Sequence, residues 1–196
     1  MKVIFTTALT DAYYDQRKAE YLYSYKSLCS MIDPSNVEIV ECYSSKGTNF
    51  FETELGIPVY YTETNRAEIK NQGVREVIAL KKYLENCSSD DSEMMIKQTG
   101  RYRFTSNFFI KEVHESNADI LVRKTEDGQS FFGAVAMTKK NFLLFFNQLD
   151  LDKMEEMSIN IERELSDFIE RNNLTEKKYS RIDMFSNIAN NFKYNW

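Results

Sequence analysis

The chain has 196 residues, of which 42% are hydrophobic and 14% aromatic, while Gly and Pro number only 6 and 2. That length suits one compact domain with a substantial core, and the scarcity of Gly and Pro excludes a disordered, collagen-like or linker-rich chain. The formal net charge of -5 argues against a protein that coats nucleic acid, because that requires a dense basic face, but it leaves room for a local basic pocket.

Strand and helix patterns alternate in the first half of the chain. Strands are expected where β-branched and aromatic residues cluster, and helices where apolar residues recur at near-helical spacing. These patterns predict strands over residues 2–8, 37–43, 57–63 and 93–98, and helices over residues 14–31 and 67–85.

The second half continues with the short segment YRF at residues 102–104, strands over 120–124 and 129–137, and helices over 139–148 and 153–172. The last two strands flank a Glu-Asp-Gly turn. They form either a hairpin, or an extension of the sheet in which the second strand returns to the edge.

The last predicted helix has an apolar stripe, with Met157, Ile161, Leu165 and Ile169 four residues apart. Strands that alternate with helices first and pair as a hairpin later favour a mixed α/β fold, with a mostly parallel central sheet flanked by helices. We expect a single domain over residues 1–196, with residues 173–196 as an aromatic tail packed on it.

The end of the strand at residues 93–98 brings cations, a hydroxyl and a glycine to one point. Ligands of open α/β sheets collect outside the carboxyl ends of the strands, so Lys97, Thr99, Gly100, Arg101 and Tyr102 form the leading candidate site. The planar fork of Arg101 suits a phosphate or carboxylate, and Gly100 would let the backbone approach a ligand closely. The alternative is a strand that ends in a surface turn, with Lys97 and Arg101 solvated.

The end of the first strand is a second candidate site, with Thr6, Thr7 and Ala8 closing the strand and Arg17 following near Asp15. The crevice after such a strand often binds a nucleotide, because helix amino termini and free backbone amides face it. The chain has neither GxGxxG nor GxxxxGK[ST], which argues against a Rossmann dinucleotide site or a P-loop kinase. The alternative for Asp15 and Arg17 is a charge pair on the surface of a helix start.

A third group opens the helix that precedes the strand at residues 93–98. Lys70, Asn71 and Gly73 lie in its starting turn, and Glu76 lies one turn in. A carboxylate there also stabilises the helix dipole, so by itself this pattern is typical of a helix cap.

Carboxylates are frequent on the last predicted helix, at Glu155, Glu156, Glu162 and Glu164. A general base requires one carboxylate that faces a pocket. Glu162 adjoins Ile161 on the apolar stripe and is therefore the candidate, whereas most such charges belong to a solvated face.

Five segments of the chain form a series: TTALTDAYYDQRKAEYLYS, KNQGVREVIALKKYL, MMIKQTGRYRF, FFGAVAMTKKNF and INIERELSDFI. In this order they resemble small glycosyltransferase-like proteins of the GT-A type, found in bacterial surface-polysaccharide clusters and in large DNA viruses. The resemblance extends to about residue 170, and its most specific parts are residues 97–102 and the Asn71, Gly73 and Glu76 signature.

The resemblance implies a nucleotide-diphospho-sugar transferase fold, with a nucleotide-sugar donor and a saccharide acceptor as partners. It implies that the first strand and Arg17 hold the nucleotide. It also implies that residues 97–102 lie beside the diphosphate or sugar, and that Glu162 lies near the acceptor.

GT-A enzymes usually place an Asp-x-Asp motif after the central strand, where it holds a divalent metal, Mn²⁺ or Mg²⁺, against the nucleotide diphosphate. Here residues 97–100 read Lys-Gln-Thr-Gly, and the acidic pair at residues 90–91 precedes the strand. We therefore expect no metal site of this type. We expect Lys97 and Arg101 to stabilise the charge that develops on the leaving diphosphate.

The leading hypothesis is thus a nucleotide-sugar-dependent glycosyltransferase. The alternative is a non-catalytic module with the same fold that binds a protein or glycan through aromatic residues of the tail, namely Phe185, Phe192, Tyr194 and Trp196. A nuclease or phosphatase is disfavoured, because no acidic cluster lies at a predicted strand end.

The cysteines and apolar segments bear on location. Cys29, Cys42 and Cys87 lack CxxC spacing and His114 is the single imidazole, which argues against a zinc site or a disulfide framework. The opening residues lack the long apolar region of a secretory signal, and no apolar run is long enough to predict a transmembrane segment. We expect a cytoplasmic protein with reduced thiols.

Overall fold

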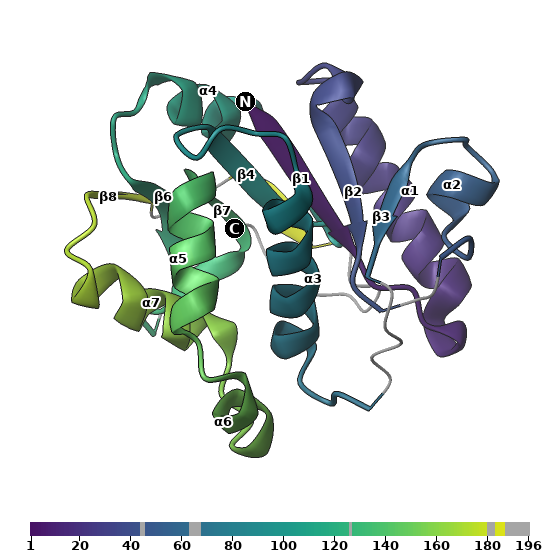
Figure 1. Cartoon of the computed structure of the whole chain (residues 1–196). Coiled ribbons are helices and arrows are strands. Elements are labelled where there is room, and N and C mark those ends of the chain that lie inside the picture. The colour runs from purple at the N-terminus through teal and green to yellow at the C-terminus, as the bar shows by residue number, and fades with distance from the viewer. Residues whose placement is uncertain (44–45, 63–67, 126, 180–182, 187–196) are drawn as a thin grey trace.

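A seven-stranded sheet forms the centre of the molecule in the computed structural model, which describes residues 1–43, 46–62, 68–125, 127–179 and 183–186 (Figure 1). The strand order is β3-β2-β1-β4-β7-β6-β8. In that order the strands span Val59–Tyr61, Val37–Glu41, Lys2–Thr7, Met94–Thr99, Ser130–Thr138, Ile120–Lys124 and Glu176–Tyr179. β7 runs antiparallel to both of its neighbours and the other pairs are parallel, so the predicted mixed, mostly parallel sheet is confirmed.

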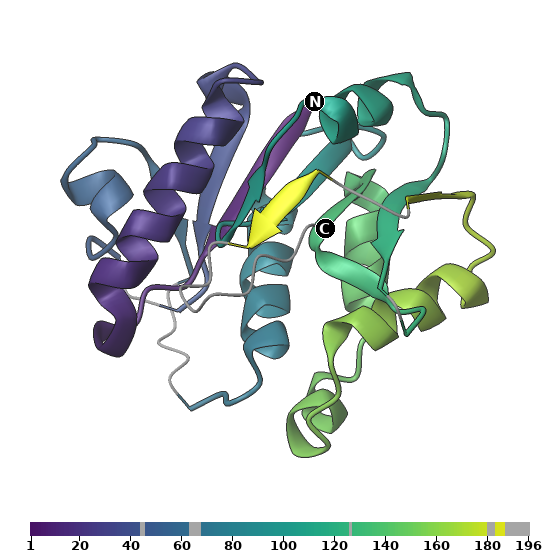
Figure 2. The ribbon, with the colours of Figure 1, turned by 180° about the vertical axis from the view of Figure 1, so that it is seen from behind.

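Helices cover both faces of this sheet (Figure 1 and Figure 2). One face carries α3 (Gln72–Asn86), α5 (Lys139–Gln148), α6 (Leu151–Glu156) and α7 (Ile161–Arg171). The other carries α1 (Tyr14–Cys29), α2 (Phe50–Thr53) and α4 (Phe108–Glu115). Because successive strand residues point to opposite faces, Ile4 packs against the helices of the α3 face, while Val3 and Phe5 pack against those of the α1 face.

A two-stranded ribbon lies on the α1 face, where β5 (Tyr102–Phe104) pairs antiparallel with β9 (Met184–Ser186). Figure 2 shows β9 crossing the back of the sheet. The expected C-terminal tail thus contributes β8 to the sheet and β9 to the ribbon. The aromatic residues Phe192, Tyr194 and Trp196 lie outside the described residues, as does the side chain of Phe185.

The carboxyl ends of three parallel strands lie level at one edge of the sheet. Thr6 in β1 is in register with Val40 in β2 and with Thr99 in β4, and Thr7 is in register with Glu41. The 3-10 helix η1 (Asp11–Tyr13) follows β1 and leads into α1, while a second one, η2 (Pro34–Asn36), precedes β2. The residues after these strand ends therefore meet at one place.

The long helix predicted over residues 153–172 is two helices. Ser158 adopts a positive φ of 52°, which ends α6, and the side chain of Asn160 caps α7 by accepting a hydrogen bond from the Arg163 N–H at 2.9 Å. Met157 is 64% exposed and does not belong to the apolar stripe, whereas Ile161, Leu165 and Ile169 are buried.

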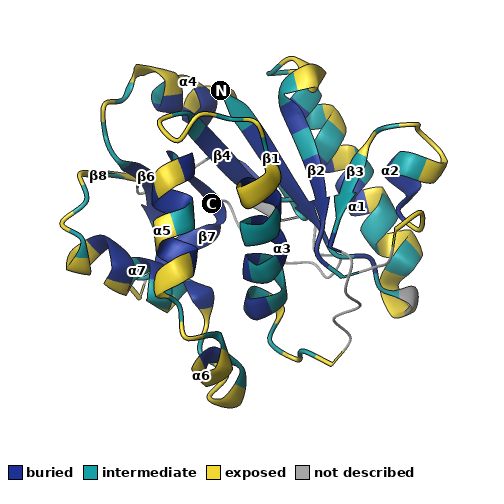
Figure 3. Ribbon diagram, in the orientation of Figure 1, coloured by how far each residue is buried: buried dark blue, intermediate teal, exposed yellow. Residues whose placement is uncertain are grey.

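Further features differ from the predicted pattern, because the helices α2 and α4 and the strands β8 and β9 were not predicted. Of the two arrangements considered for β6 and β7, the hairpin is correct. Figure 3 shows β7 buried along its length, in agreement with its apolar composition.

None of the helices in the described part of the chain has the length and apolar composition that spanning a bilayer requires.

Candidate functional site

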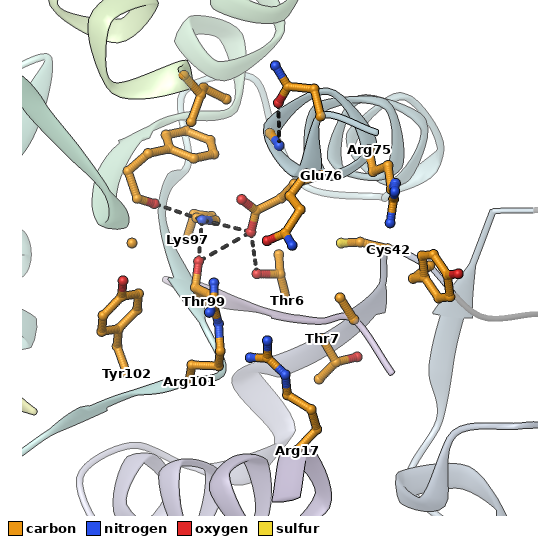
Figure 4. A pocket seen from close by; sticks show the side chains of 18 of the residues that line it. Thr6, Thr7, Arg17, Cys42, Arg75, Glu76, Lys97, Thr99, Arg101 and Tyr102 are labelled. Atoms are coloured by element: carbon orange, nitrogen blue, oxygen red, sulfur yellow. Dashed lines mark hydrogen bonds and ion pairs between the residues drawn. The ribbon is translucent and has the colours of Figure 1, made fainter. Parts of the chain in front are cut away.

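A cavity of about 370 Å³ lies at the carboxyl edge of β1, β2 and β4 (Figure 4). The starts of α1, α3 and α7 and the middle of β7 close its sides. It is lined by all of the predicted site residues except Lys70 and Gly100: Thr6, Thr7, Ala8, Arg17, Asn71, Gly73, Lys97, Thr99, Arg101, Tyr102 and Glu162. Residues from five separate segments of the sequence are thus brought together.

An ion pair forms the floor of this cavity. The Lys97 ammonium lies 2.8 Å from Oε1 of Glu76, which extends from the first turns of α3. The same oxygen accepts hydrogen bonds from the hydroxyls of Thr6 at 2.6 Å and Thr99 at 3.2 Å. Two adjacent strands and a helix are therefore joined at one carboxylate oxygen.

Lys97 is fully enclosed by the protein. Its ammonium donates to Glu76, to the Thr99 hydroxyl at 2.6 Å and to the Phe132 carbonyl at 2.7 Å, and it lies 4.1 Å from the centre of the Phe132 ring. An ammonium has three N–H donors, so all of them are used internally. The expected contact between Lys97 and a diphosphate would require one of these bonds to break, and the geometry gives this lysine the role of positioning Glu76.

Three arginines line the cavity, namely Arg17, Arg75 and Arg101, and the last of them has no ion-pair partner among the described residues. Figure 4 shows the guanidinium groups of Arg17, from α1, and Arg101, from the turn after β4, on the same side of the cavity below Thr6 and Thr99. Arg17 lies 3.7 Å from Glu20, so its ion-pair partner is not the expected Asp15. Arg101 makes no hydrogen bond or ion pair with the described residues and is half-buried.

A carboxyl group and a phenol also line the cavity. Glu162 lies in the first turn of α7, and burial raises the pKa of its carboxyl above the ordinary value. Burial likewise raises the pKa of Tyr102, so its hydroxyl stays protonated and can donate a hydrogen bond. The Tyr102 ring is fixed edge-on against Phe131, with the ring centres 5.1 Å apart.

Two predicted site residues lie elsewhere. Lys70 is exposed outside the cavity, and its backbone N–H donates to the Glu155 carboxylate at 2.7 Å. Gly100 is buried, and a Cβ at this position would lie 2.8 Å from both the Phe5 and the Tyr21 rings. The absence of a side chain at residue 100 therefore serves core packing, not the expected close approach of a ligand.

Thr7 and Ala8, which line the cavity at the end of β1, have structural partners. The Thr7 hydroxyl donates to Glu41 at 2.8 Å, and the Ala8 N–H donates to the Tyr21 hydroxyl at 3.0 Å. Burial raises the pKa of Tyr21 to about 12, so that hydroxyl remains neutral. These contacts fix the carboxyl end of β1.

Asn71 joins two helices at the opposite wall. Its side-chain oxygen caps α3 by accepting from the Gly73 N–H at 2.9 Å, and its amide donates to the carbonyls of Met154 at 2.9 Å and Ile159 at 3.0 Å. A Cβ on Gly73 would lie 3.4 Å from that of Ile161. Asn71 and Gly73 therefore hold α3 tightly against the connection into α7.

Glu76 was named from the sequence only as a helix-start carboxylate and as part of the Asn71, Gly73 and Glu76 signature, and no role in the site was predicted for it. Its signal was its spacing, because a residue three positions after Gly73 lies on the same face of α3 and so faces the strand ends. Aromatic and basic residues of the cavity rim were also missed. Arg75 lies over the ring of Tyr43 at 4.9 Å, and the exposed Tyr13 stands beside the start of α1.

The site does not fit a divalent metal held by an Asp-x-Asp motif. The carboxylates that line the cavity are Glu76 and Glu162, and Oε1 of Glu76 is occupied by Lys97. Over the described ranges, no group of three or more His, Cys, Asp or Glu side chains is placed to hold a metal ion. Asp90 and Asp91 precede β4 at its amino end, on the side of the sheet away from the cavity.

No protein-family model matches the sequence, and no curated protein matches it either. Solved structures do match. A protein assigned as a glucose-1-phosphate thymidylyltransferase from Bacillus anthracis shares 14% identity at a TM-score of 0.59, with 95% of this chain and 89% of that chain covered. A protein assigned as a nucleotide-diphospho-sugar transferase from Desulfovibrio desulfuricans shares 11% identity at a TM-score of 0.57, with coverages of 91% and 80%.

The galactosyltransferase LgtC, solved with donor and acceptor sugar analogs, shares 10% identity at a TM-score of 0.53, with coverages of 91% and 73%. At such identities the similarity concerns the fold. The chain has the nucleotide-diphospho-sugar transferase fold of the GT-A type, which confirms the fold that the sequence resemblance implied.

Proposed function

We propose that this protein transfers a sugar from a nucleotide-sugar donor to a saccharide or glycan acceptor in polysaccharide or glycan biosynthesis. The observation that carries the proposal is the pair of arginines, Arg17 and Arg101, which face one cavity at the ligand edge of a nucleotide-sugar transferase fold. The unpaired state of all three cysteines supports a reducing, cytoplasmic location.

Two guanidinium groups that share a cavity repel each other unless an anion lies between them. A diphosphate supplies two negative charges and several acceptor oxygens, and the planar donor fork of arginine matches phosphate geometry. When the bond from the sugar C1 to the phosphate oxygen breaks, negative charge develops on the leaving diphosphate. Arg17 and Arg101 would stabilise that charge from fixed positions.

The acceptor half of the reaction needs a proton acceptor. Burial raises the pKa of Glu162, which makes it a stronger base than an ordinary carboxylate once it is ionised. In a direct displacement, Glu162 takes the proton of the acceptor hydroxyl while the acceptor oxygen bonds to C1 and the nucleoside diphosphate leaves. The Tyr102 hydroxyl, which makes no hydrogen bond within the described residues, is available to orient either substrate.

A product assay tests this function. The purified chain is incubated with UDP-sugars, GDP-sugars and a panel of oligosaccharide acceptors, and released nucleoside diphosphate is measured with and without EDTA. We expect acceptor-dependent release that survives EDTA, because no carboxylate cluster among the described residues is placed to hold a metal. Release of pyrophosphate from nucleoside triphosphates and sugar phosphates would instead assign nucleotidyl transfer. Failure of every nucleotide and nucleotide sugar to raise the melting temperature would assign a non-catalytic binding module.

A further inference from the structure

The carboxylate of Glu76 is occupied on one side and open on the other. Its hydrogen bonds and ion pair with the described residues, from Thr6, Thr99 and Lys97, all reach Oε1, as the dashed lines of Figure 4 show. Oε2 makes no hydrogen bond with the residues that the structure describes, and the side chain is 18% exposed within the cavity lining. One oxygen is therefore fixed by the protein while the other is presented to the cavity.

We propose that Oε2 of Glu76 accepts a hydrogen bond from a hydroxyl of the transferred sugar, and so selects donors that carry that hydroxyl. This inference rests on the proposed sugar transfer. A carboxylate repels a diphosphate, so the phosphates belong beside Arg17 and Arg101 and the uncharged part of the donor belongs beside Glu76. An ionised carboxylate only accepts hydrogen bonds, and sugar hydroxyls are the donors that a neutral hexose offers.

The fixation of Oε1 makes this recognition strict. Glu76 is held between β1, β4 and α3 by three donors, so its second oxygen cannot move to follow a differently shaped ligand. A site built to bond a substrate hydroxyl discriminates strongly against an analogue that lacks it, because the buried polar group is then left unpaired.

Titration calorimetry with UDP, UDP-glucose, UDP-galactose, GDP and GDP-mannose tests the assignment. In the wild-type chain, a sugar that fits is expected to bind more tightly than its parent nucleoside diphosphate. Glu76→Gln keeps the size of the side chain but replaces one acceptor oxygen by a donor. It is expected to weaken binding of that nucleotide sugar by about 10-fold or more, while the parent diphosphate binds as well as before or better. Glu85→Gln is the matched control, since Glu85 is exposed near the other end of α3.

The variant leaves Lys97 buried without its ion pair, so a second variant combines Glu76→Gln with Lys97→Met, which replaces the buried ammonium with an apolar side chain of similar length. It is expected to show the same selective loss. The role of Glu76 would be overturned if the variants lost affinity equally for the nucleotide sugar and the diphosphate, or lost none. It would also be overturned if no nucleotide sugar bound the wild-type chain more tightly than its parent diphosphate. If no nucleoside diphosphate binds the wild-type chain, the proposed function fails as well.

Discussion

Replacement of Arg101 by alanine is expected to weaken binding of UDP or GDP while leaving the fold intact. The guanidinium faces the cavity and has no hydrogen-bond or ion-pair partner among the described residues, so a bound diphosphate would receive its charge-assisted bonds directly. One such bond contributes about 1.5–3 kcal/mol, which corresponds to about a 10- to 150-fold loss of affinity. Solvent in the cavity and the remaining Arg17 place the expected effect toward the lower end of that range.

Stability should change little, because Arg101 makes no hydrogen bond or ion pair with the described residues that the alanine variant could lose. Calorimetric titration measures the affinity, and urea unfolding followed by circular dichroism measures the fold. Arg163→Ala is the matched control, since Arg163 is exposed on α7. An Arg101→Ala chain that folds normally and binds both diphosphates as tightly as the wild type would refute the role of Arg101.

Three other substitutions separate chemistry from packing. Glu162→Gln is expected to lower transfer by about 10²- to 10⁴-fold. Unchanged turnover would exclude Glu162 as the base. Because burial raises the pKa of Glu162, its ionisation at neutral pH lowers the stability of the wild type. The stability that Glu162→Gln gains over the wild type in urea should therefore be larger at neutral pH than at acidic pH. Gly100→Ala should lower the free energy of unfolding by about 1–3 kcal/mol, as its Cβ meets the Phe5 and Tyr21 rings; equal stability would show that the core yields there. Asn71→Ala should cost about 2 kcal/mol through the lost helix cap and lost amide bonds, and a cost near zero in urea unfolding would contradict its clamping role.

Most strands of the sheet could be predicted from the sequence because their apolar runs are long and well bounded, whereas the mostly charged β8 was not predicted. β1, β2, β4 and the β6–β7 hairpin lie where β-branched and aromatic residues cluster, and the helix α3 follows its apolar period. The position of β7 between β4 and β6 could not be predicted in this way, because strand order depends on long-range pairing.

The helices α6 and α7 show where periodicity misleads. Met157 continues the four-residue spacing of Ile161, Leu165 and Ile169, yet it is exposed because Ser158 turns the chain just after it. Asn160 is a favourable N-cap residue, so the start of α7 could have been predicted from its capping residue. The apolar spacing alone continues across Asn160 and gives no sign of a helix start.

The cavity lies at the sheet edge where the sequence predicted a site, but the sequence led us to expect the same role for Lys97 and Arg101. Lys97 lies within β4 and points to the face covered by α3, where its buried charge is compensated by an ion pair with Glu76. Arg101 lies past the strand end and is free to face the cavity. The alternation of side chains along β4 could therefore have distinguished the buried Lys97 from Arg101. The partner of the buried lysine could not be predicted, because it depends on how α3 packs on the sheet.

A crystal structure of the chain with UDP or GDP bound tests the central claim most directly. We predict that the diphosphate lies at the carboxyl edge of β1 and β4, with the guanidinium groups of Arg17 and Arg101 within about 3.2 Å of phosphate oxygens. A nucleotide bound outside this cavity, or a diphosphate held by a carboxylate-bound metal away from both arginines, would contradict it.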